Sequence, residues 1–133
     1  MPRYALITGA SSGIGLAIAE ALARRGRNLI LLARQRDALE SIACELTQRF
    51  GVEVLFSSCD LSEPLQLSGL LQELELADQQ IDLLVNNAGF GTAGAFLQQE
   101  WSREQQLLEV NILALTRLCH ALGQRMVQQG GGQ

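Results

Sequence analysis

The sequence predicts an α/β fold in which helices cover both faces of a doubly wound parallel sheet. Short apolar runs alternate along the chain with longer segments whose apolar residues recur at helical spacing, which is the pattern of βαβ units. A glycine-rich segment, residues 9–15, follows the first apolar run, where a strand would turn into a helix. With 133 residues, 47% of them hydrophobic, the chain is long enough to bury one core.

The first half of the chain predicts two strands, each followed by a helix. The strands are expected over residues 4–8 and 29–33, and the helices are expected to end near Gly26 and Gly51. The first helix begins at Ile14, and its apolar residues at helical spacing are Ile14, Ala17, Ile18, Ala21 and Leu22. In the second helix this set is Leu39, Ile42, Ala43, Leu46 and Phe50.

The second half predicts two more strands, over residues 52–56 and 81–85, and two more helices. Ser62 can cap the first of these helices, with Pro64 in its first turn and a buried stripe of Leu67, Leu70, Leu71 and Leu74. The last helix is expected to start at Ser102, which forms a capping-box pair with Gln105. Its inward stripe is predicted to contain Leu108, Ile112, Leu115, Cys119, Leu122 and Met126.

Right-handed crossover connections between these strands give the sheet order 3-2-1-4. The fourth strand then lies at an uncovered edge, which favours association of the isolated chain with another copy. The glycine run 130–132 predicts either a turn into another element or a disordered tail.

Composition narrows the classes of partner and the compartment. Ten arginines stand against fourteen acidic residues without a basic cluster, so neither nucleic acid nor a membrane surface is an expected partner. No apolar run approaches the roughly 20 residues of a membrane span. The cysteines, Cys44, Cys59 and Cys119, are odd in number and lack metal-site spacing, which favours free thiols, no metal and a cytoplasmic location.

The glycine-rich segment predicts a site for the pyrophosphate of a dinucleotide. Its glycines would allow a tight turn and a close approach of the ligand to the backbone, and the helix N-terminus that follows offers unpaired N–H groups to an anion. A P-loop is excluded, because the chain contains no lysine to hold the β- and γ-phosphates.

Four motifs together resemble the short-chain dehydrogenase/reductase family. They are TGASSGIG at 8–15, Cys-Asp-Leu at 59–61, Asn-Asn-Ala-Gly at 86–89 and Val-Asn-Ile at 110–112. The resemblance covers the whole chain but only about the first half of a typical family member, which has a Rossmann-like fold. It implies that residues 1–133 are the N-terminal part of a single Rossmann dinucleotide-binding domain, truncated before the fifth strand and without the catalytic C-terminal part.

The resemblance also implies a role for the residues of each motif. Asp60 is expected to bond the adenine amino group, with Leu61 packed beside the ring. Asn111 matches the asparagine that kinks its helix and holds a water in the proton relay, so it is the catalytic residue expected in this chain. The residues expected to hold the ribose and pyrophosphate are Gly9, Ser11, Ser12, Gly13, Ile14 and Gly15 in the glycine turn, with Asn87, Ala88 and Gly89 against the ribose.

The family's catalytic Ser and its Tyr-x-x-x-Lys pair have no counterpart in this chain. Its single tyrosine, Tyr4, precedes the glycine turn, and lysine is absent from the sequence. The resemblance therefore implies that the parent protein is an enzyme and that the 133-residue chain alone is inactive.

The end of the second strand predicts a preference for NADP(H). A carboxylate there would bind the ribose 2′-hydroxyl and repel a 2′-phosphate, whereas this chain has Ala33 followed by Arg34. A guanidinium can bind the phosphate through charge-assisted hydrogen bonds, as in the NADP-preferring members of the family. Arg36 is either a second such group or a solvated first-turn residue.

The predicted function is that of an NADP(H)-dependent oxidoreductase that moves a hydride between the nicotinamide and a small-molecule carbonyl or alcohol. A homo-oligomer is expected, because family members often pair through the helix that holds Asn111 and the helix after it. The alternative is a non-catalytic nucleotide-binding or regulatory module. A Rossmann-like methyltransferase would need an acidic residue at the end of the second strand and gives no reason for the Asn-Asn-Ala-Gly motif.

Overall fold

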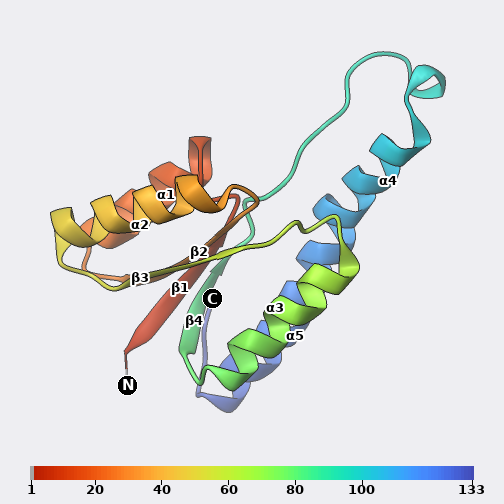
Figure 1. Cartoon of the computed structure of the whole chain (residues 1–133). Coiled ribbons are helices and arrows are strands. Elements are labelled where there is room, and N and C mark those ends of the chain that lie inside the picture. Colours follow the sequence, from red (N-terminus) through yellow and green to blue (C-terminus); the bar gives the residue numbers. More distant parts are fainter. Residues whose placement is uncertain (1) are drawn as a thin grey trace.

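The computed structural model describes residues 2–133, in which helices pack on both faces of a four-stranded parallel sheet (Figure 1). The strand order is β3-β2-β1-β4, as predicted. The elements are β1 (Arg3–Thr8), α1 (Gly13–Arg24), β2 (Asn28–Ala33), α2 (Arg36–Phe50), β3 (Val54–Ser58), α3 (Pro64–Leu76), β4 (Gln80–Val85), η1 (Phe96–Gln98), α4 (Trp101–Leu108), η2 (Glu109–Ala114) and α5 (Leu115–Gln128).

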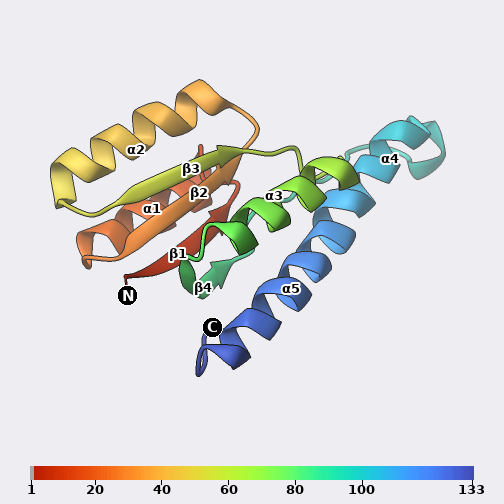
Figure 2. The same ribbon diagram turned by 60° about the horizontal axis from the view of Figure 1, so that its bottom comes forward.

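Side chains of the central strand β1 alternate between two apolar cores. Ala5 and Ile7 face the core covered by α1 and α2, whereas Tyr4 and Leu6 face the core covered by α3 and α5. Figure 2 shows these two helix pairs on opposite sides of the sheet. Because all four strands run parallel, their carboxyl ends meet at one edge, where a ligand site is expected in such folds.

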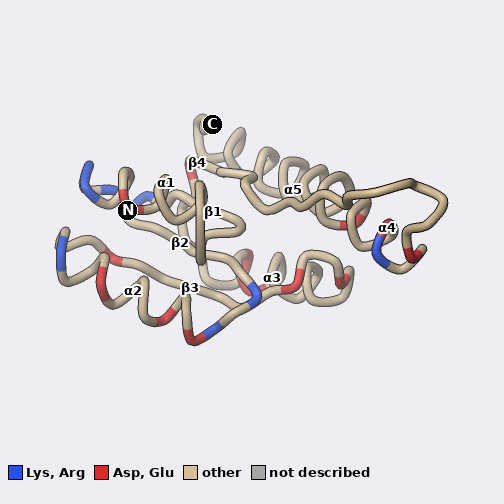
Figure 3. Tube along the Cα trace, turned by 90° about the horizontal axis from the view of Figure 1, so that it is seen from above, with Lys and Arg blue, Asp and Glu red and all other residues tan. Residues whose placement is uncertain are grey.

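Charged residues lie on separate elements rather than in one patch. Figure 3 shows the arginine positions dispersed along the trace and interspersed with acidic ones. Across residues 2–133, none of the helices combines the length and the apolar character needed to cross a membrane.

The predicted strands over residues 4–8, 29–33 and 81–85 and the predicted first helix each begin one residue earlier in the structure. Three further element starts were wrong by one or two residues. Strand β3 begins at Val54 rather than at residue 52. The N-cap of α3 is Glu63, because the Ser62 hydroxyl donates to Asp60 Oδ1 at 2.7 Å and does not cap the helix. Helix α4 begins at Trp101 after Glu100 and has no side-chain cap, so the predicted capping box at Ser102 does not form.

The apolar set predicted for α1 is not the face that packs on the sheet. Ile14, Ala17 and Ala21 are exposed, and Ile18 and Leu22 are half-buried. The buried residues of α1 are Gly15, Ala19 and Ala23, which lie four residues apart. These side chains are small, so the helix can approach the sheet more closely than a face of larger residues would allow.

The predicted last helix contains a π-helical segment, η2, between α4 and α5. A π turn holds an extra residue and so changes which side chains before and after it share a face. Leu122 and Met126 are buried as predicted, together with Ala114 and Leu118. The other predicted members are exposed and form an outer stripe: Leu108, Ile112, Leu115 and Cys119. Pairing of two copies through this helix stays a prediction.

The outer edge of β4 is engaged by Gln133. The Gln133 N–H donates to the Asp82 carbonyl at 2.9 Å, and the Leu84 N–H donates to the Gln133 carbonyl at 2.8 Å. This is the hydrogen-bond pattern of a parallel pair, so β4 is not fully uncovered at this point. Gly130 and Gly131, with φ of 99° and 135°, make the reversal, and the glycine run is therefore a turn rather than a tail.

Candidate nucleotide-binding site

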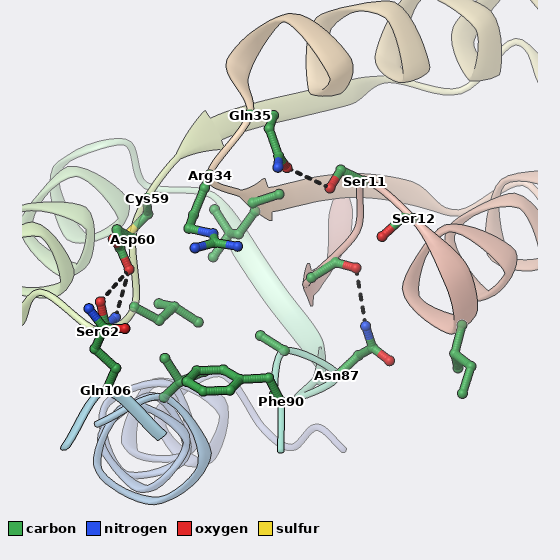
Figure 4. Close-up of a pocket in the computed structure, with 18 of the residues that line it drawn as sticks. Ser11, Ser12, Arg34, Gln35, Cys59, Asp60, Ser62, Asn87, Phe90 and Gln106 are labelled. Carbon is green, nitrogen blue, oxygen red and sulfur yellow. Dashed lines mark hydrogen bonds between the residues drawn. The ribbon is translucent and has the colours of Figure 1, made fainter. Parts of the chain in front are cut away.

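A pocket of about 500 Å³ lies at the carboxyl ends of the strands (Figure 4). Its volume is within the range of small-molecule sites. The structure brings ten of the predicted cofactor residues to its wall: Gly9, Ser11, Ser12, Ile14, Arg34, Asp60, Leu61, Asn87, Ala88 and Gly89. Gly13, Gly15 and Asn111 are not among the residues that line this pocket.

Glycine is required in the turn for two different reasons. Gly9 and Gly13 have φ of 63° and 56°, a region that other residues rarely adopt. Gly15 is required by close approach, since a Cβ there would collide with the Gly9 carbonyl oxygen and with Asn87 Nδ2. Gly15 does not line the pocket. Its lack of a side chain lets α1 pack directly against Gly9 and Asn87.

The N-terminus of α1 opens toward the turn without a side-chain cap. Ser12 is the N-cap residue in an extended conformation, and its hydroxyl makes no cap hydrogen bond. The first N–H groups of a helix lack partners within the helix, and the helix dipole gives this end a partial positive charge. This arrangement suits the pyrophosphate of a dinucleotide.

A hydrogen-bond network around Thr8 joins the glycine turn to the segment that follows β4. Thr8 Oγ1 accepts the N–H groups of Asn87 at 3.0 Å and Ala88 at 2.9 Å. Asn87 Nδ2 donates to the carbonyl oxygens of Thr8 and Gly9, at 3.2 and 3.1 Å. The Thr8 side chain is only 1% exposed, so this network fixes two walls of the pocket relative to each other.

Arg34 extends into the pocket from the end of β2 (Figure 4). Within residues 2–133, no carboxylate forms an ion pair with it. Next to it, Ser11 Oγ donates to Gln35 Oε1 at 3.2 Å, which leaves the Gln35 amide N–H groups available for a ligand. Arg36 lies over the Phe56 ring, 5.4 Å from its centroid, and is not a lining residue, so it is not a second pocket cation.

The Asp60 side chain is partly used by its own loop. Its Oδ1 accepts the Ser62 N–H at 3.0 Å and the Ser62 hydroxyl at 2.7 Å. The Asp60 N–H donates to Gln66 Oε1 at 2.9 Å. These bonds hold the carboxylate in place at the wall of the pocket and leave acceptor capacity on Oδ2.

Cys59 lies beside Asp60 and is buried, while Cys44 and Cys119 are exposed. Burial raises the pKa of the Cys59 thiol to about 11, and the charges of Asp60 and Glu73 act in the same direction. Because the thiolate is the nucleophile, we expect Cys44 and Cys119 to react with Ellman's reagent at pH 8 in the native protein and Cys59 to react only after unfolding.

The control for this prediction is Cys59→Ser, which should leave the native thiol count unchanged at two. Rapid reaction of three thiols in the native protein would contradict it.

Asn111 lies in the π-helical segment η2, consistent with the expected kink in its helix. The Asn111 side chain binds the loop after β4. Its Oδ1 accepts the Phe90 N–H at 3.1 Å, and its Nδ2 donates to the Phe90 carbonyl at 2.7 Å. Both polar atoms of the side chain are thus engaged with the backbone. The expected water in the proton relay stays a prediction.

Several lining residues were not identified from the sequence. Gln35 and Phe90 directly follow predicted site residues, so their positions next to Arg34 and Gly89 were the available signal. One face of α4 and η2 also lines the pocket and was missed: Arg103, Gln106 and Val110, which are spaced by three and four residues.

Comparison with known proteins agrees with this geometry. Residues 3–133 match the short chain dehydrogenase family. A fatty acyl-CoA reductase from Acinetobacter baylyi is 33% identical over 98% of this chain and 45% of its own length. A short-chain dehydrogenase from Sphingobium yanoikuyae, solved in complex with NADPH, is 42% identical with a TM-score of 0.91, over 99% of this chain and 51% of that one.

A third protein, L-sorbose reductase from Gluconobacter frateurii, was solved with NADPH and L-sorbose. It is 37% identical with a TM-score of 0.90, over 98% of this chain and 50% of its own. The chain thus spans about half the length of the relatives that it matches.

Proposed function

Since the chain belongs to the short-chain dehydrogenase family, we propose that it binds NADP(H) as the nucleotide-binding part of an oxidoreductase. The parent enzyme would transfer a hydride between the nicotinamide and a carbonyl or alcohol substrate. The observation that carries the cofactor assignment is Arg34, which enters the pocket at the end of β2 without an acidic partner in residues 2–133. The NADPH complexes of similar structures support it.

In this proposal each wall of the pocket holds one part of the cofactor. The turn from Gly9 to Gly15 and the N-terminus of α1 bind the pyrophosphate, and Arg34 binds the 2′-phosphate with Ser11 and Gln35 beside it. Asp60 and Leu61 contact the adenine, while Asn87, Ala88 and Gly89 lie against the ribose.

Replacement of Arg34 by alanine should weaken NADPH binding roughly tenfold to a hundredfold, because charge-assisted bonds to the 2′-phosphate are lost. NADH affinity should change little, since NADH lacks that phosphate. Isothermal titration calorimetry with both nucleotides measures the two affinities on the same protein.

Ala33→Asp is the opposite change and should reverse the preference, because a carboxylate repels the phosphate and accepts the 2′-hydroxyl. Arg36→Ala is the matched control, since Arg36 is a neighbouring arginine outside the pocket. An equal loss of NADPH and NADH affinity in Arg34→Ala would refute the assignment.

We also propose that the 133-residue chain binds the cofactor but does not turn over a carbonyl substrate. Tyr4 lies at the amino end of β1, away from the pocket, and its hydroxyl is hydrogen-bonded to Glu53. This bond, together with burial and the Glu53 charge, raises the Tyr4 pKa to about 12. A general acid contributes roughly 10² to 10⁴-fold to such a reaction, and no other tyrosine or lysine is present to supply the proton.

The measurement is NADPH oxidation with a panel of aldehydes and ketones, followed by absorbance. We expect the rate of the chain to equal that of a control with cofactor alone. Turnover by the chain that disappears in Gly13→Val, a change that strains the turn because Gly13 has a φ of 56°, would show that the chemistry lies within these residues.

A further inference from the structure

Phe90 lines the pocket on the wall opposite the glycine turn. Figure 4 shows its side chain extending from the loop after β4 toward Gln106 and Ser62, away from Ser11 and Ser12. Asp60, one of the two residues proposed to contact adenine, lies on this same side in Figure 4, and Leu61, the other, follows it in the chain and also lines the pocket. The ring therefore offers a flat apolar surface where the proposed site needs one for a base.

Two contacts from the helical segment fix this ring. Asn111 binds both the N–H and the carbonyl of Phe90, at 3.1 and 2.7 Å, so the backbone at this residue has little freedom to rotate. The Arg103 guanidinium lies over the ring, 4.1 Å from the ring centroid, and Arg103 itself lines the pocket. Phe90 is thus held through its backbone by one residue and through its ring by another.

We propose that Phe90 is an adenine-binding residue and that Asn111 and Arg103 are positioning residues that act on nucleotide affinity through its ring. The inference rests on the nucleotide-binding function proposed above and adds a binding role for Asn111 that is separate from proton transfer. It follows that the helical segment α4–η2 contributes to cofactor binding as well as to any chemistry.

The probe is adenosine 2′,5′-bisphosphate, which carries the adenine and the 2′-phosphate but no nicotinamide, so binding is measured without turnover. Phe90→Ala should weaken its binding by about tenfold, consistent with the energies of aromatic contacts to bases. Phe96→Ala is the matched control, because Phe96 is an exposed aromatic residue in η1, in the same connection between β4 and α4, and does not line the pocket.

Asn111→Leu removes both hydrogen bonds to Phe90 and should also weaken binding of the probe. Asn111→Asp keeps the acceptor for the Phe90 N–H, so its affinity for the probe should lie between those of the wild type and Asn111→Leu. Arg103→Ala should give a smaller loss of a few-fold, and Arg103→Lys should resemble it, because an ammonium lacks the planar stacking surface. Arg103 is exposed, so these two variants should remain folded if an Asn111 variant does not.

A double-mutant cycle identifies the route of the effect. If Asn111 and Arg103 act through the ring, their replacement should cost little more once Phe90 is alanine. Full additivity, or unchanged binding in Phe90→Ala, would overturn the inference. If Phe90→Ala binds the probe normally but Arg34→Ala binds it more weakly, the proposed function stands and only the role of Phe90 is rejected. If the wild-type chain does not bind the probe, both the proposed function and this inference are rejected.

Discussion

Replacing Gly15 by alanine should destabilise the chain by about 3 kcal/mol and abolish measurable nucleotide binding. The added Cβ would meet the Gly9 carbonyl oxygen and Asn87 Nδ2, so either α1 must move off the sheet or the Asn87 bonds to the turn must break. Both responses would disrupt the glycine turn that we propose binds the pyrophosphate. Urea unfolding followed by circular dichroism gives the stability, and calorimetry with NADPH gives the affinity.

Gly123→Ala is the matched control, because Gly123 lies inside α5 and an added Cβ meets no atom within 4 Å. Alanine is a better helix former than glycine, so this variant should gain about 0.5 to 1 kcal/mol. The stability of Gly13→Ala should lie between those of Gly15→Ala and Gly123→Ala, because the space at Gly13 is open but its φ of 56° strains an alanine. A Gly15→Ala protein with wild-type stability and NADPH affinity would show that the close approach is not required.

Thr8→Val should cost roughly 2 to 6 kcal/mol in the free energy of unfolding, because it leaves two partly buried N–H groups without an acceptor. These are the N–H groups of Asn87 and Ala88, which both donate to Thr8 Oγ1. Valine has nearly the shape of threonine, so the loss is not a packing effect. NADPH affinity of Thr8→Val should also fall, because the Thr8 hydrogen bonds connect the glycine turn to the segment of the pocket wall that follows β4.

Thr8→Ser separates the hydroxyl from the methyl group. It keeps the acceptor for both N–H groups and should cost only about 1 kcal/mol for the lost methyl. Thr116→Val serves as a surface control, because Thr116 is exposed and its hydroxyl donates to the Ile112 carbonyl one turn earlier in the continuous helical segment. Equal losses in Thr8→Ser and Thr8→Val would mean that packing, not hydrogen bonding, makes Thr8 important.

The strand order and most of the pocket could be predicted from the sequence because they depend on local patterns. A buried parallel strand requires an apolar run, and a turn that packs closely on its neighbours requires glycine, as Gly9 and Gly15 show. The predicted site residues come from segments that follow β1, β2, β3 and β4. Once the sheet is parallel, its topology alone brings those segments to one edge.

The helix faces could not be predicted in the same way. In the last helical segment both Leu115 and Leu118 belong to apolar stripes, but only Leu118 is buried. Which face of this helical segment is buried depends on the π-helical turn at η2 and on the hydrogen bonds between Asn111 and Phe90, which are 21 residues apart in the chain. Helical periodicity within a segment carries no information about such contacts.

The sequence by itself therefore determined the family, the sheet order and the residues that meet at the carboxyl ends of the strands. Three contacts were decided only by the tertiary structure. Gly15 packs against Gly9 and Asn87, Thr8 accepts the Asn87 N–H, and Asn111 donates to the Phe90 carbonyl. The physical reason is that strand and turn formation are governed by neighbouring residues, whereas the partner of a side chain is fixed by packing between segments that are distant along the chain.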